Sequence, residues 1–266
     1  MGARKRVYRA KPDLKKDQAF MVNPNAIRWI VSQSNLRKTD TILEIGAGTG
    51  NLTRALASSG ARIIAVENDA LLEKALRKNL RSFPGVEIVI GNALRLLDAG
   101  GFRFDKVISN IPYAISEPLI QRLIFHEFGL AVLTLPKSFA RRLIAARWER
   151  EYSRLSFVFQ SFFMVQACLD LQRDSFSPAP KTNSVILKFV SKTRNTVACQ
   201  LLLRPDMAVK NALRESLCSA RGCTKNSARQ TISSLELGSL MERKVSELGA
   251  DEIKSILKKA AEFRED

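Results

Sequence analysis

Five short apolar runs separated by amphipathic helical patterns narrow the possible folds of this chain at once. Each run is rich in Ile, Val or Leu and is short enough to be a buried strand. Strands that alternate with helices are typical of βαβ units and of a parallel, doubly wound sheet. The sequence therefore predicts an α/β fold whose first strands are residues 41–45, 62–66, 86–90, 106–109 and 130–135.

Further elements flank these runs. Asn23 and Pro24 are a typical helix start, so we expect a helix over 25–34 before the first strand. Two more strands, on either side of a proline-containing turn, complete a mostly parallel sheet of seven strands. The sequence predicts these strands over 166–171 and 184–190, after helices over 138–147 and 152–162.

The last part of the chain has helical patterns without strands. Residues 191–196 are polar and lack apolar periodicity, which is typical of a linker. At roughly 150 residues per domain, the length allows one large domain and a small one. We expect an α/β domain over 1–190 and a small all-helical domain over 191–266, with helices over 204–217, 225–235 and 251–263.

A glycine-rich turn follows the first run. Glu44-Ile45-Gly46-Ala47-Gly48-Thr49-Gly50 lies between a strand and a helix, where glycine lets the backbone turn sharply and approach a ligand closely. Glu67 lies 21 positions after Gly46, at the end of the second strand. A carboxylate there accepts hydrogen bonds from two ribose hydroxyls. The pattern predicts a nucleotide cofactor, and both NAD and S-adenosylmethionine carry such a ribose.

Two details favour S-adenosylmethionine over NAD. Asn51 stands where the dinucleotide pattern G-x-G-x-x-G requires its third glycine. Glu44 precedes the first glycine by two positions, where an acidic group repels a pyrophosphate but tolerates a cationic sulfonium.

The chemistry is predicted at Asn110-Ile111-Pro112-Tyr113, directly after the fourth run. At that place in a doubly wound sheet a loop faces the ligand crevice. Asn110 offers a side-chain carbonyl, Ile111 a backbone carbonyl, Pro112 a fixed loop and Tyr113 a ring on which a base can stack. Two acceptors aimed at an exocyclic amine make it a better nucleophile toward an electrophilic methyl group. Positioning and electrostatics then suffice for the reaction, and no side chain is needed to accept a proton. A nucleobase must leave its stack to enter such a site.

A formal net charge of +17 concerns partners rather than fold. Phosphate neutralisation by Lys and Arg provides most of the sequence-independent affinity for nucleic acid, so the charge favours a nucleic-acid partner. The alternative is that the charge serves solubility alone. The basic residues form three clusters, within 1–16, 137–154 and 204–229, which indicates an extended polyanion footprint. The basic residues expected to contact nucleic acid are Lys15, Lys16, Arg141, Arg142, Arg147, Arg221, Lys225 and Arg229.

Other site classes are disfavoured. The single histidine, His126, leaves little room for a histidine-based triad, and the four scattered cysteines form no C-x-x-C pair, so no metal site is expected. No apolar run approaches the ~18 residues of a membrane span. The basic N-terminus has no signal-peptide apolar stretch before Lys16, and a cytoplasmic protein is expected. Trp29 and Trp148 are expected to pack.

With these motifs in place, the chain resembles the small-subunit ribosomal RNA adenine dimethyltransferases, the KsgA family, in an archaeal or eukaryotic-like form. The resemblance spans about residues 12–265, nearly the whole chain. It rests on Gln18–Val22, Glu44–Gly50, Glu67-x-Asp69, Gly91–Leu94, Asn110–Tyr113, Ile115-Ser116-x-Pro118, Arg154–Ser156 and Phe176-x-Pro178-x-Pro180-Lys181.

The resemblance implies a class I methyltransferase fold, S-adenosyl-L-methionine as cofactor and a monomeric enzyme. It implies dimethylation of N6 on two adjacent adenines near the 3′ end of small-subunit ribosomal RNA, with RNA or the pre-small ribosomal subunit as partner. Carried over residue by residue, the cofactor contacts fall on Ala19, Met21, Gly46, Gly48, Glu67, Asn92 and Asn110. The catalytic loop falls on Asn110, Ile111, Pro112 and Tyr113. Phe176 either stacks on the target base opposite Tyr113 or packs in the core.

Three positions depart from the family pattern. Ala19 replaces a polar residue, Asn92 replaces an aspartate expected to accept from the cofactor's adenine amine, and Asn183 replaces an aspartate. These changes leave open a non-catalytic RNA-binding assembly factor with a drifted cofactor pocket. A glutamine methylase acting on protein is disfavoured by the charge, Ile111 and the Phe176–Lys181 turn. A large-subunit resistance methylase is nearer, but the long basic tail disfavours it.

Overall fold

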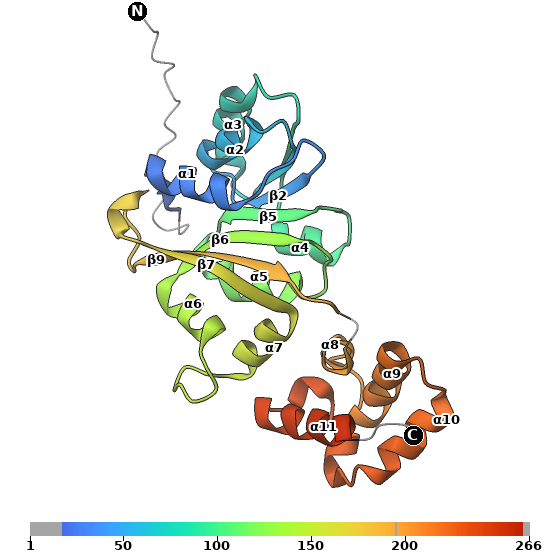
Figure 1. Ribbon diagram of the computed structural model, residues 1–266. Helices are drawn as coiled ribbons and strands as arrows, with labels where there is room; N and C mark the ends of the chain where they lie inside the picture. Colours follow the sequence, from blue (N-terminus) through green and yellow to red (C-terminus); the bar gives the residue numbers. More distant parts are fainter. Residues whose placement is uncertain (1–17, 195, 263–266) are drawn as a thin grey trace, which may run out of the picture. The chain divides into compact units, whose positions relative to one another are not determined.

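The computed structural model describes residues 18–194 and 196–262 (Figure 1). Its strands are β1 Phe20–Met21, β2 Thr41–Ile45, β3 Arg62–Glu67, β4 Val86–Ile90, β5 Lys106–Asn110, β6 Leu130–Pro136, β7 Phe163–Leu171, β8 Phe176–Ser177 and β9 Ser184–Ser191. Its α-helices are α1 Pro24–Gln33, α2 Asn51–Ala57, α3 Glu73–Leu80, α4 Ala93–Asp98, α5 Ser116–Leu123, α6 Lys137–Ile144, α7 Arg154–Phe162, α8 Val197–Leu202, α9 Val209–Arg221, α10 Lys225–Ser234 and α11 Ala250–Glu262.

The main sheet has seven strands in the order β4-β3-β2-β5-β6-β9-β7. The pairs β3–β4, β2–β3, β2–β5 and β5–β6 are parallel, and β6–β9 is antiparallel. The predicted doubly wound, mostly parallel seven-stranded sheet is therefore confirmed. The central strands are buried on both faces: neighbouring residues that point to opposite faces, such as Ile42 and Leu43 on β2 or Val107 and Ile108 on β5, are at most 1% exposed. This explains why these strands appear as continuous apolar runs.

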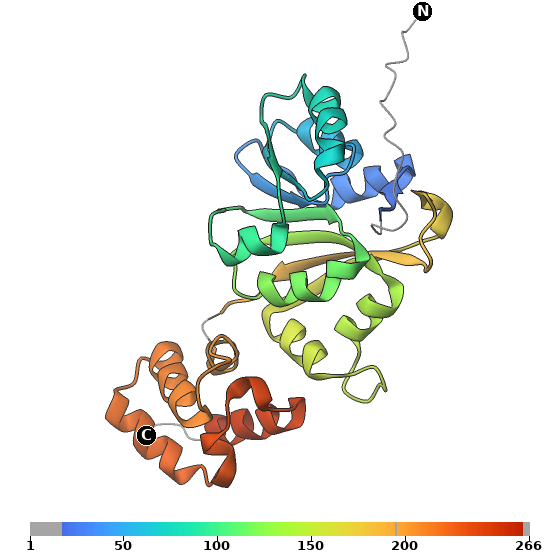
Figure 2. The ribbon, with the colours of Figure 1, turned by 180° about the vertical axis from the view of Figure 1, so that it is seen from behind.

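Helices cover the sheet in two groups. Helix α2 contacts α1 and α3, whereas α4 contacts α5. Figure 2 shows α4 and α5 in front of the strands when the molecule is seen from behind. Helix α1 starts as predicted, because the Asn23 side chain accepts hydrogen bonds from Asn25 N and Ala26 N, and Pro24 occupies the first turn.

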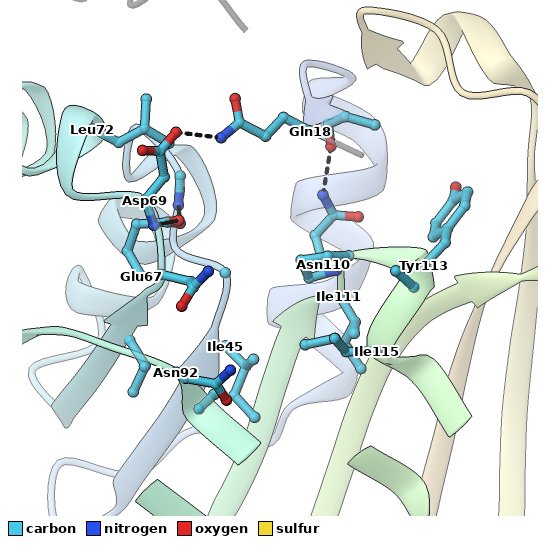
Figure 3. A pocket seen from close by; sticks show the side chains of 18 of the residues that line it. Gln18, Ile45, Glu67, Asp69, Leu72, Asn92, Asn110, Ile111, Tyr113 and Ile115 are labelled. Carbon is cyan, nitrogen blue, oxygen red and sulfur yellow. Dashed lines mark hydrogen bonds between the residues drawn. The ribbon is translucent and has the colours of Figure 1, made fainter. Parts of the chain in front are cut away.

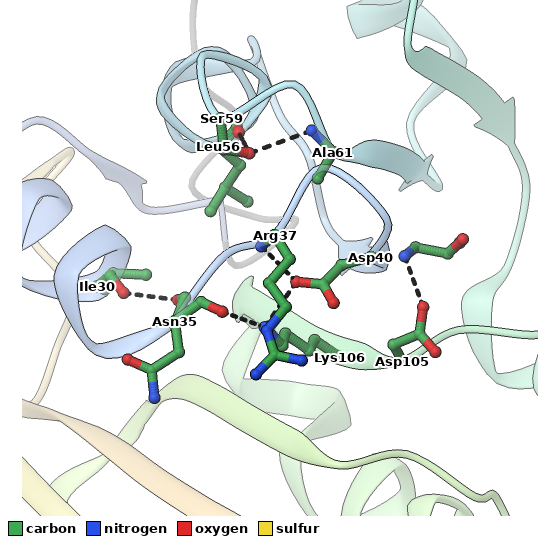
Figure 4. A network of polar contacts seen from close by, with 11 residues as sticks. Ile30, Asn35, Arg37, Asp40, Leu56, Ser59, Ala61, Asp105 and Lys106 are labelled. Atoms are coloured by element: carbon green, nitrogen blue, oxygen red, sulfur yellow. Dashed lines mark hydrogen bonds and ion pairs between the residues drawn. The ribbon is translucent and has the colours of Figure 1, made fainter.

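A polar network ties the loop before β2 to β5 (Figure 4). Lys106 Nζ lies 2.6 Å from Asp40 Oδ2, and the same oxygen accepts from Arg37 N at 2.6 Å. Lys106 also donates to the backbone carbonyl of Asn35. Burial alone raises the pKa of Asp40, but Lys106 and the Arg37 amide outweigh it and lower that pKa. The network fixes the strand ends opposite the carboxyl edge and serves stability.

By its contacts the described chain divides into two compact units, residues 18–141 with 164–191 and residues 142–163 with 192–262. The predicted division after residue 190 therefore differs in one segment, 142–163. This segment joins the C-terminal helices because Arg154 Nη2 donates to Val245 O and Lys254 Nζ lies 4.3 Å from the centre of the Tyr152 ring. Within the second unit, α8 contacts α9 and α9 contacts α10.

Candidate active site

A cavity of about 430 Å³ opens at the carboxyl ends of the parallel strands. It lies where the strand order reverses between β2 and β5, which is the usual ligand crevice of a doubly wound sheet. Its volume falls within the range of small-molecule sites, roughly 300–1,000 Å³. Residues from the ends of four strands line it, together with the segment before β1: Gln18, Ala19, Phe20, Ile45, Gly46, Gly48, Val66, Glu67, Asn68, Asp69, Leu72, Gly91, Asn92, Ala93, Asn110, Ile111, Pro112, Tyr113, Ala114 and Ile115 (Figure 3).

The glycine turn, which lines this cavity, packs closely against Pro112 and Phe20. Gly46 and Gly48 have φ values of 76° and 58°, in the region that favours glycine. A Cβ atom on Gly46 would lie 2.9 Å from Pro112 Cδ, and one on Gly48 would lie 2.9 Å from the Phe20 ring. Glycine is therefore required at both positions for conformation and for space.

Glu67 is held in place at the end of β3. Its Oε2 accepts from Gly48 N at 2.7 Å and its Oε1 accepts from Asp69 N at 2.8 Å. The side chain is buried, yet it lines the cavity. Each carboxylate oxygen keeps further acceptor capacity, so Glu67 can bind the hydroxyls of a ribose without moving.

Asn110 has a fixed amide orientation. Its Nδ2 donates to the backbone carbonyl of Ala19 at 2.9 Å, which turns Oδ1 away from Ala19. Asn110 Oδ1 is buried and has no hydrogen-bond partner among the described residues. Figure 3 shows this oxygen on the side of Tyr113. A buried acceptor without a donor is costly, which indicates that a ligand supplies the donor.

The rest of the predicted catalytic loop surrounds this acceptor. Ile111 is buried, and Pro112 lies against Gly46. The Tyr113 hydroxyl hydrogen-bonds Ser184 Oγ at the start of β9, which fixes the ring along the cavity wall. All four residues of the loop thus line one cavity with Glu67, from a strand two positions away in the sheet.

Asn92 also lines the cavity, but its oxygen is already engaged. Oδ1 accepts from Leu94 N at 3.0 Å and from Arg95 N at 3.2 Å, and so caps α4. The amide NH₂ is then the group left for a ligand. The expectation that Asn92 offers an acceptor oxygen to an adenine amine is therefore not supported by this geometry.

Glu44 plays a different part from the one its charge suggested. It is 2% exposed, does not line the main cavity, and its Oε2 has no partner among the described residues. Burial raises its pKa to about 8; the Glu67 charge adds to this, and the Thr53 hydroxyl acts in the opposite direction. Glu44 is thus mostly neutral at pH 7, so it does not repel a pyrophosphate as its residue type suggests.

Two predicted site residues do not line the cavity. Met21 and Phe176 are 3% and 4% exposed, belong to the hydrophobic core, and face each other in the β1–β8 pair. Phe176 therefore packs in the core in this structure and is not placed to stack on a base opposite Tyr113. The backbone carbonyl of Met21 accepts a hydrogen bond from Asn51 Nδ2, at the start of α2, at 3.2 Å.

Sequence reasoning missed the pairing of β1, whose Phe20 lines the cavity. Strand β1 pairs antiparallel with β8, which lies more than 150 positions later in the chain. Gln18 Nε2 reaches across to Asp69 Oδ2 at 2.8 Å. Both paired segments, Gln18–Val22 and Phe176–Lys181, stand out as motifs, but two-residue strands give no periodicity from which a pairing could be predicted.

The predicted RNA contacts are dispersed over both units. Lys15 and Lys16 lie outside the described residues. Arg141 and Arg147 are exposed, and Arg142 is partly buried. In the second unit, Lys225 and Arg229 are exposed one turn apart on α10, whereas Arg221 Nη2 donates to Ala260 O at 2.7 Å. Arg221 thus has a structural contact as well.

Among residues 18–194 and 196–262, no group of His, Cys, Asp and Glu side chains is placed to hold a metal ion. Within the same ranges, no helix combines the length and the apolar character needed to cross a membrane.

Solved structures define the class of this fold as a class I methyltransferase. A dimethyladenosine transferase from Plasmodium falciparum is 26% identical with a TM-score of 0.65, and the match covers 91% of this chain and 98% of that one. The 23S rRNA methyltransferase ErmE has the same fold, with a TM-score of 0.58 at 20% identity over 91% of this chain and 99% of that one.

The sequence comparisons are more specific. The model of the ribosomal RNA adenine dimethylase family matches residues 10–201. The probable ribosomal RNA small subunit methyltransferase A of Thermococcus gammatolerans is 32% identical, covering 94% of this chain and 89% of the relative. That of Pyrococcus furiosus is 31% identical, covering 94% and 92%. The chain belongs to the ribosomal RNA adenine dimethylase family, and the resemblance found in the sequence is confirmed.

Proposed function

We propose that this protein uses S-adenosyl-L-methionine to dimethylate N6 of adjacent adenines near the 3′ end of small-subunit ribosomal RNA, during biogenesis of the small subunit. The observation that carries the proposal is the buried, unpartnered Oδ1 of Asn110, fixed by Ala19 O beside the Tyr113 ring. The family membership and the names of the archaeal relatives support the same reaction and RNA class.

The residues lining the cavity fit S-adenosyl-L-methionine. Glu67 presents a carboxylate at the end of β3, and Gly46 and Gly48 give an approach that a Cβ would close. Ile45, Val66 and Leu72 provide apolar wall for a ring system. When bound, the cofactor supplies an electrophilic methyl group.

The chain's own residues act on the other reactant. Asn110 Oδ1 would accept a hydrogen bond from the exocyclic amine of an adenine, and the backbone carbonyl of Ile111 would accept a second. Both bonds draw the nitrogen lone pair out of conjugation with the ring, so the amine becomes a stronger nucleophile. Tyr113, tethered to Ser184, would hold the flipped base flat by stacking. Positioning and preorganised dipoles carry the rate, since no general base is required.

The non-catalytic alternative rests on Ala19 and Asn92. Ala19 acts here through its backbone carbonyl, which holds Asn110, so the absent polar side chain leaves that contact intact. Asn92 keeps the α4 cap that its oxygen provides. Neither change disables the Asn110 acceptor, and this favours the enzyme over the assembly factor.

Replacing Asn110 with alanine tests the proposal. We expect a rate loss of at least about 10²-fold, comparable to losing one oxyanion-hole donor, with a smaller loss of cofactor affinity. The matched control is Asn79→Ala, because Asn79 Nδ2 also donates to a backbone carbonyl, that of Thr49 at 2.9 Å, but does not line the cavity. The measurement is mass analysis of methylated adenines in small-subunit RNA.

Three outcomes separate the candidates. Near-parent turnover in Asn110→Ala excludes Asn110 as the acceptor. A parent protein that binds RNA but shows no binding of S-adenosyl-L-methionine by calorimetry supports the assembly factor. Methylation of large-subunit RNA in preference to small-subunit RNA would transfer the assignment to the resistance methylases. We further propose that the protein acts as a monomer in the cytoplasm, on the pre-small ribosomal subunit.

A further inference from the structure

Trp148 lies on the surface, contrary to the expectation that it packs. Its exposed fraction is 87%, the highest of the exposed large apolar residues among those the structure describes. It belongs to the loop 145–153 between α6 and α7. Single exposed apolar residues are common and need no explanation by themselves. This indole, however, stands on an ordered loop with exposed arginines near it in the sequence.

The loop is tied down on the side that precedes Trp148. Gln160 Nε2 donates to Leu143 O at 3.0 Å and to Ala145 O at 2.9 Å. Ala146 N donates to the Glu149 carboxylate at 2.6 Å, and Glu149 N donates to Ala146 O at 2.9 Å. Two hydrogen bonds thus close a tight turn, and Trp148 stands at its tip.

The side that follows Trp148 is also fixed. Tyr152 N donates to Glu149 O at 3.1 Å. Ser153 caps α7, and the Tyr152 ring lies under Lys254 Nζ at 4.3 Å. The backbone that carries the indole is therefore ordered before any partner binds, which lowers the entropy lost on binding.

The charge around this turn fits a polyanion. Segment 141–154 contains five arginines against Glu149 and Glu151. The carboxylate of Glu149 is engaged by the Ala146 amide, so its charge is directed into the turn. Arg147 and Arg150 are exposed on either side of Trp148 in the sequence. An aromatic ring between basic side chains is the arrangement with which proteins hold single-stranded nucleic acid.

We propose that Trp148 stacks on an unpaired base of the substrate RNA while Arg147 and Arg150 contact the adjacent phosphates. The proposal rests on the proposed function, since that function supplies the RNA, and it adds a recognition site to it. Stacking depends little on base identity because every base has a flat face, so this contact would anchor an unpaired nucleotide. Sequence-specific selection of the methylated adenine remains with the Asn110–Tyr113 loop.

The first test observes the indole itself. The sequence contains two tryptophans, and Trp29 is partly buried on α1, so Trp29→Phe leaves Trp148 as the reporter. A small-subunit RNA fragment with unpaired adenines should quench its fluorescence in a saturable manner. The same fragment with those adenines paired to a complementary strand should quench it much less. Equal quenching by both forms contradicts stacking on an unpaired base.

The second test separates stacking from charge. Trp148→Ala should weaken RNA binding about 5- to 140-fold, the range given by stacking energies of about 1–3 kcal/mol per base. Trp148→Phe should restore most of the affinity, and the salt dependence should be the same in all three proteins. Arg147→Ala with Arg150→Ala should instead reduce the slope of log affinity against log salt by about 1.4, at ~0.7 per phosphate on single strands.

Two controls guard the interpretation. Phe125 is 53% exposed and lies outside segment 141–154, so Phe125→Ala should leave RNA affinity unchanged. S-adenosyl-L-methionine affinity should be unaltered in every variant. RNA affinity in Trp148→Ala equal to the parent's overturns the proposal. So does a concentration-dependent dimer that Trp148→Ala abolishes, which would make the indole a contact between copies.

The proposed function fails in a different way. A parent protein that neither binds nor methylates small-subunit RNA removes the reaction and this site together. A parent that methylates the RNA while Trp148→Ala does so with unchanged affinity removes the Trp148 site alone.

Discussion

Replacing Glu44 with glutamine should remove a steep pH dependence of stability. Burial raises the pKa of Glu44 from 4.5 to about 8, with a smaller contribution from Glu67. Above pH 4.5 the unfolded chain has released this proton while the folded protein retains it. The folded state therefore binds more protons, and its stability falls as the pH rises until about pH 8. Below pH 4.5 the penalty is absent, because both states are protonated.

The magnitude follows from the same shift. Each pH unit inside the window costs about 1.4 kcal/mol, so the free energy of unfolding should fall by roughly 2–3 kcal/mol between pH 5.5 and 7.5. Glutamine does not titrate, so Glu44→Gln should lack this contribution. The buried amide adds a pH-independent cost of its own. The diagnostic quantity is therefore the pH dependence of the difference between variant and parent, whatever its sign at one pH.

The assay is urea unfolding at several pH values, followed by Trp29 in a Trp148→Phe background. Trp29 lies in the same compact unit as Glu44, so its fluorescence reports the relevant transition. Asp40→Asn is the matched control, because the pKa of Asp40 is lowered: its contribution is present above its unfolded value of 3.8 and is lost only in acid. Its difference from the parent should be flat between pH 5.5 and 7.5. A flat difference for Glu44→Gln as well would refute the raised pKa.

Three further changes test the cofactor site and the basic surface. Glu67→Gln should weaken S-adenosyl-L-methionine binding about 10- to 100-fold, as measured by calorimetry. Each carboxylate oxygen of Glu67 accepts from one backbone N–H, of Gly48 or of Asp69, and an amide has only one such oxygen and no charge for the ribose hydroxyls. An unchanged dissociation constant contradicts the ribose assignment. Asn92→Asp should tighten cofactor binding about three- to tenfold, since one carboxylate oxygen keeps the α4 cap and the other becomes a charged acceptor; weaker binding would show that the ligand needs the amide as donor. Lys225→Ala with Arg229→Ala should lower the salt slope of RNA binding by about 1.4–1.8 without affecting the cofactor, and an unchanged slope removes α10 from the RNA footprint; Arg221 is left intact because it bonds Ala260 O.

The parts of the fold that can be predicted from the sequence are those that repeat. For strands β2 to β6 the predicted and observed ends agree within one residue, because strands buried on both faces appear as uninterrupted apolar runs. The parallel order of these strands is enough to bring Gly46, Glu67 and Asn110 to one edge of the sheet. Strands β1 and β8 and the short helix α8 are not predicted, because they have too few residues for a period.

The segment 142–163 shows a different limit. Its helical pattern is evident in the sequence, but the pattern says only that one face is apolar, not which partner covers that face. The contacts of Arg154 with Val245 and of Lys254 with Tyr152 join it to helices that follow much later in the chain. The exposure of Trp148 could not be predicted for a similar reason. A tryptophan in a basic loop is equally compatible with packing or with presentation, and the Ala146–Glu149 turn decides between them.

Asn92 and Glu44 show that residue type alone does not determine what a site offers a ligand. The sequence places an amide at position 92 and an acid at position 44, each near the cofactor turn. The backbone N–H groups of Leu94 and Arg95, at the start of α4, donate to the Asn92 oxygen. Only the amide NH₂ is left for a ligand, so Asn92 offers the cavity a donor instead of the acceptor expected from the sequence. Burial raises the pKa of Glu44 to about 8, so this side chain is mostly neutral at pH 7, although its residue type suggests a negative charge. Glu67, by contrast, accepts from two backbone N–H donors, one on each oxygen, as a carboxylate can and an amide cannot. Because its local backbone holds both carboxylate oxygens at the cavity wall, we expect Glu67 to provide the carboxylate contact to a ligand there.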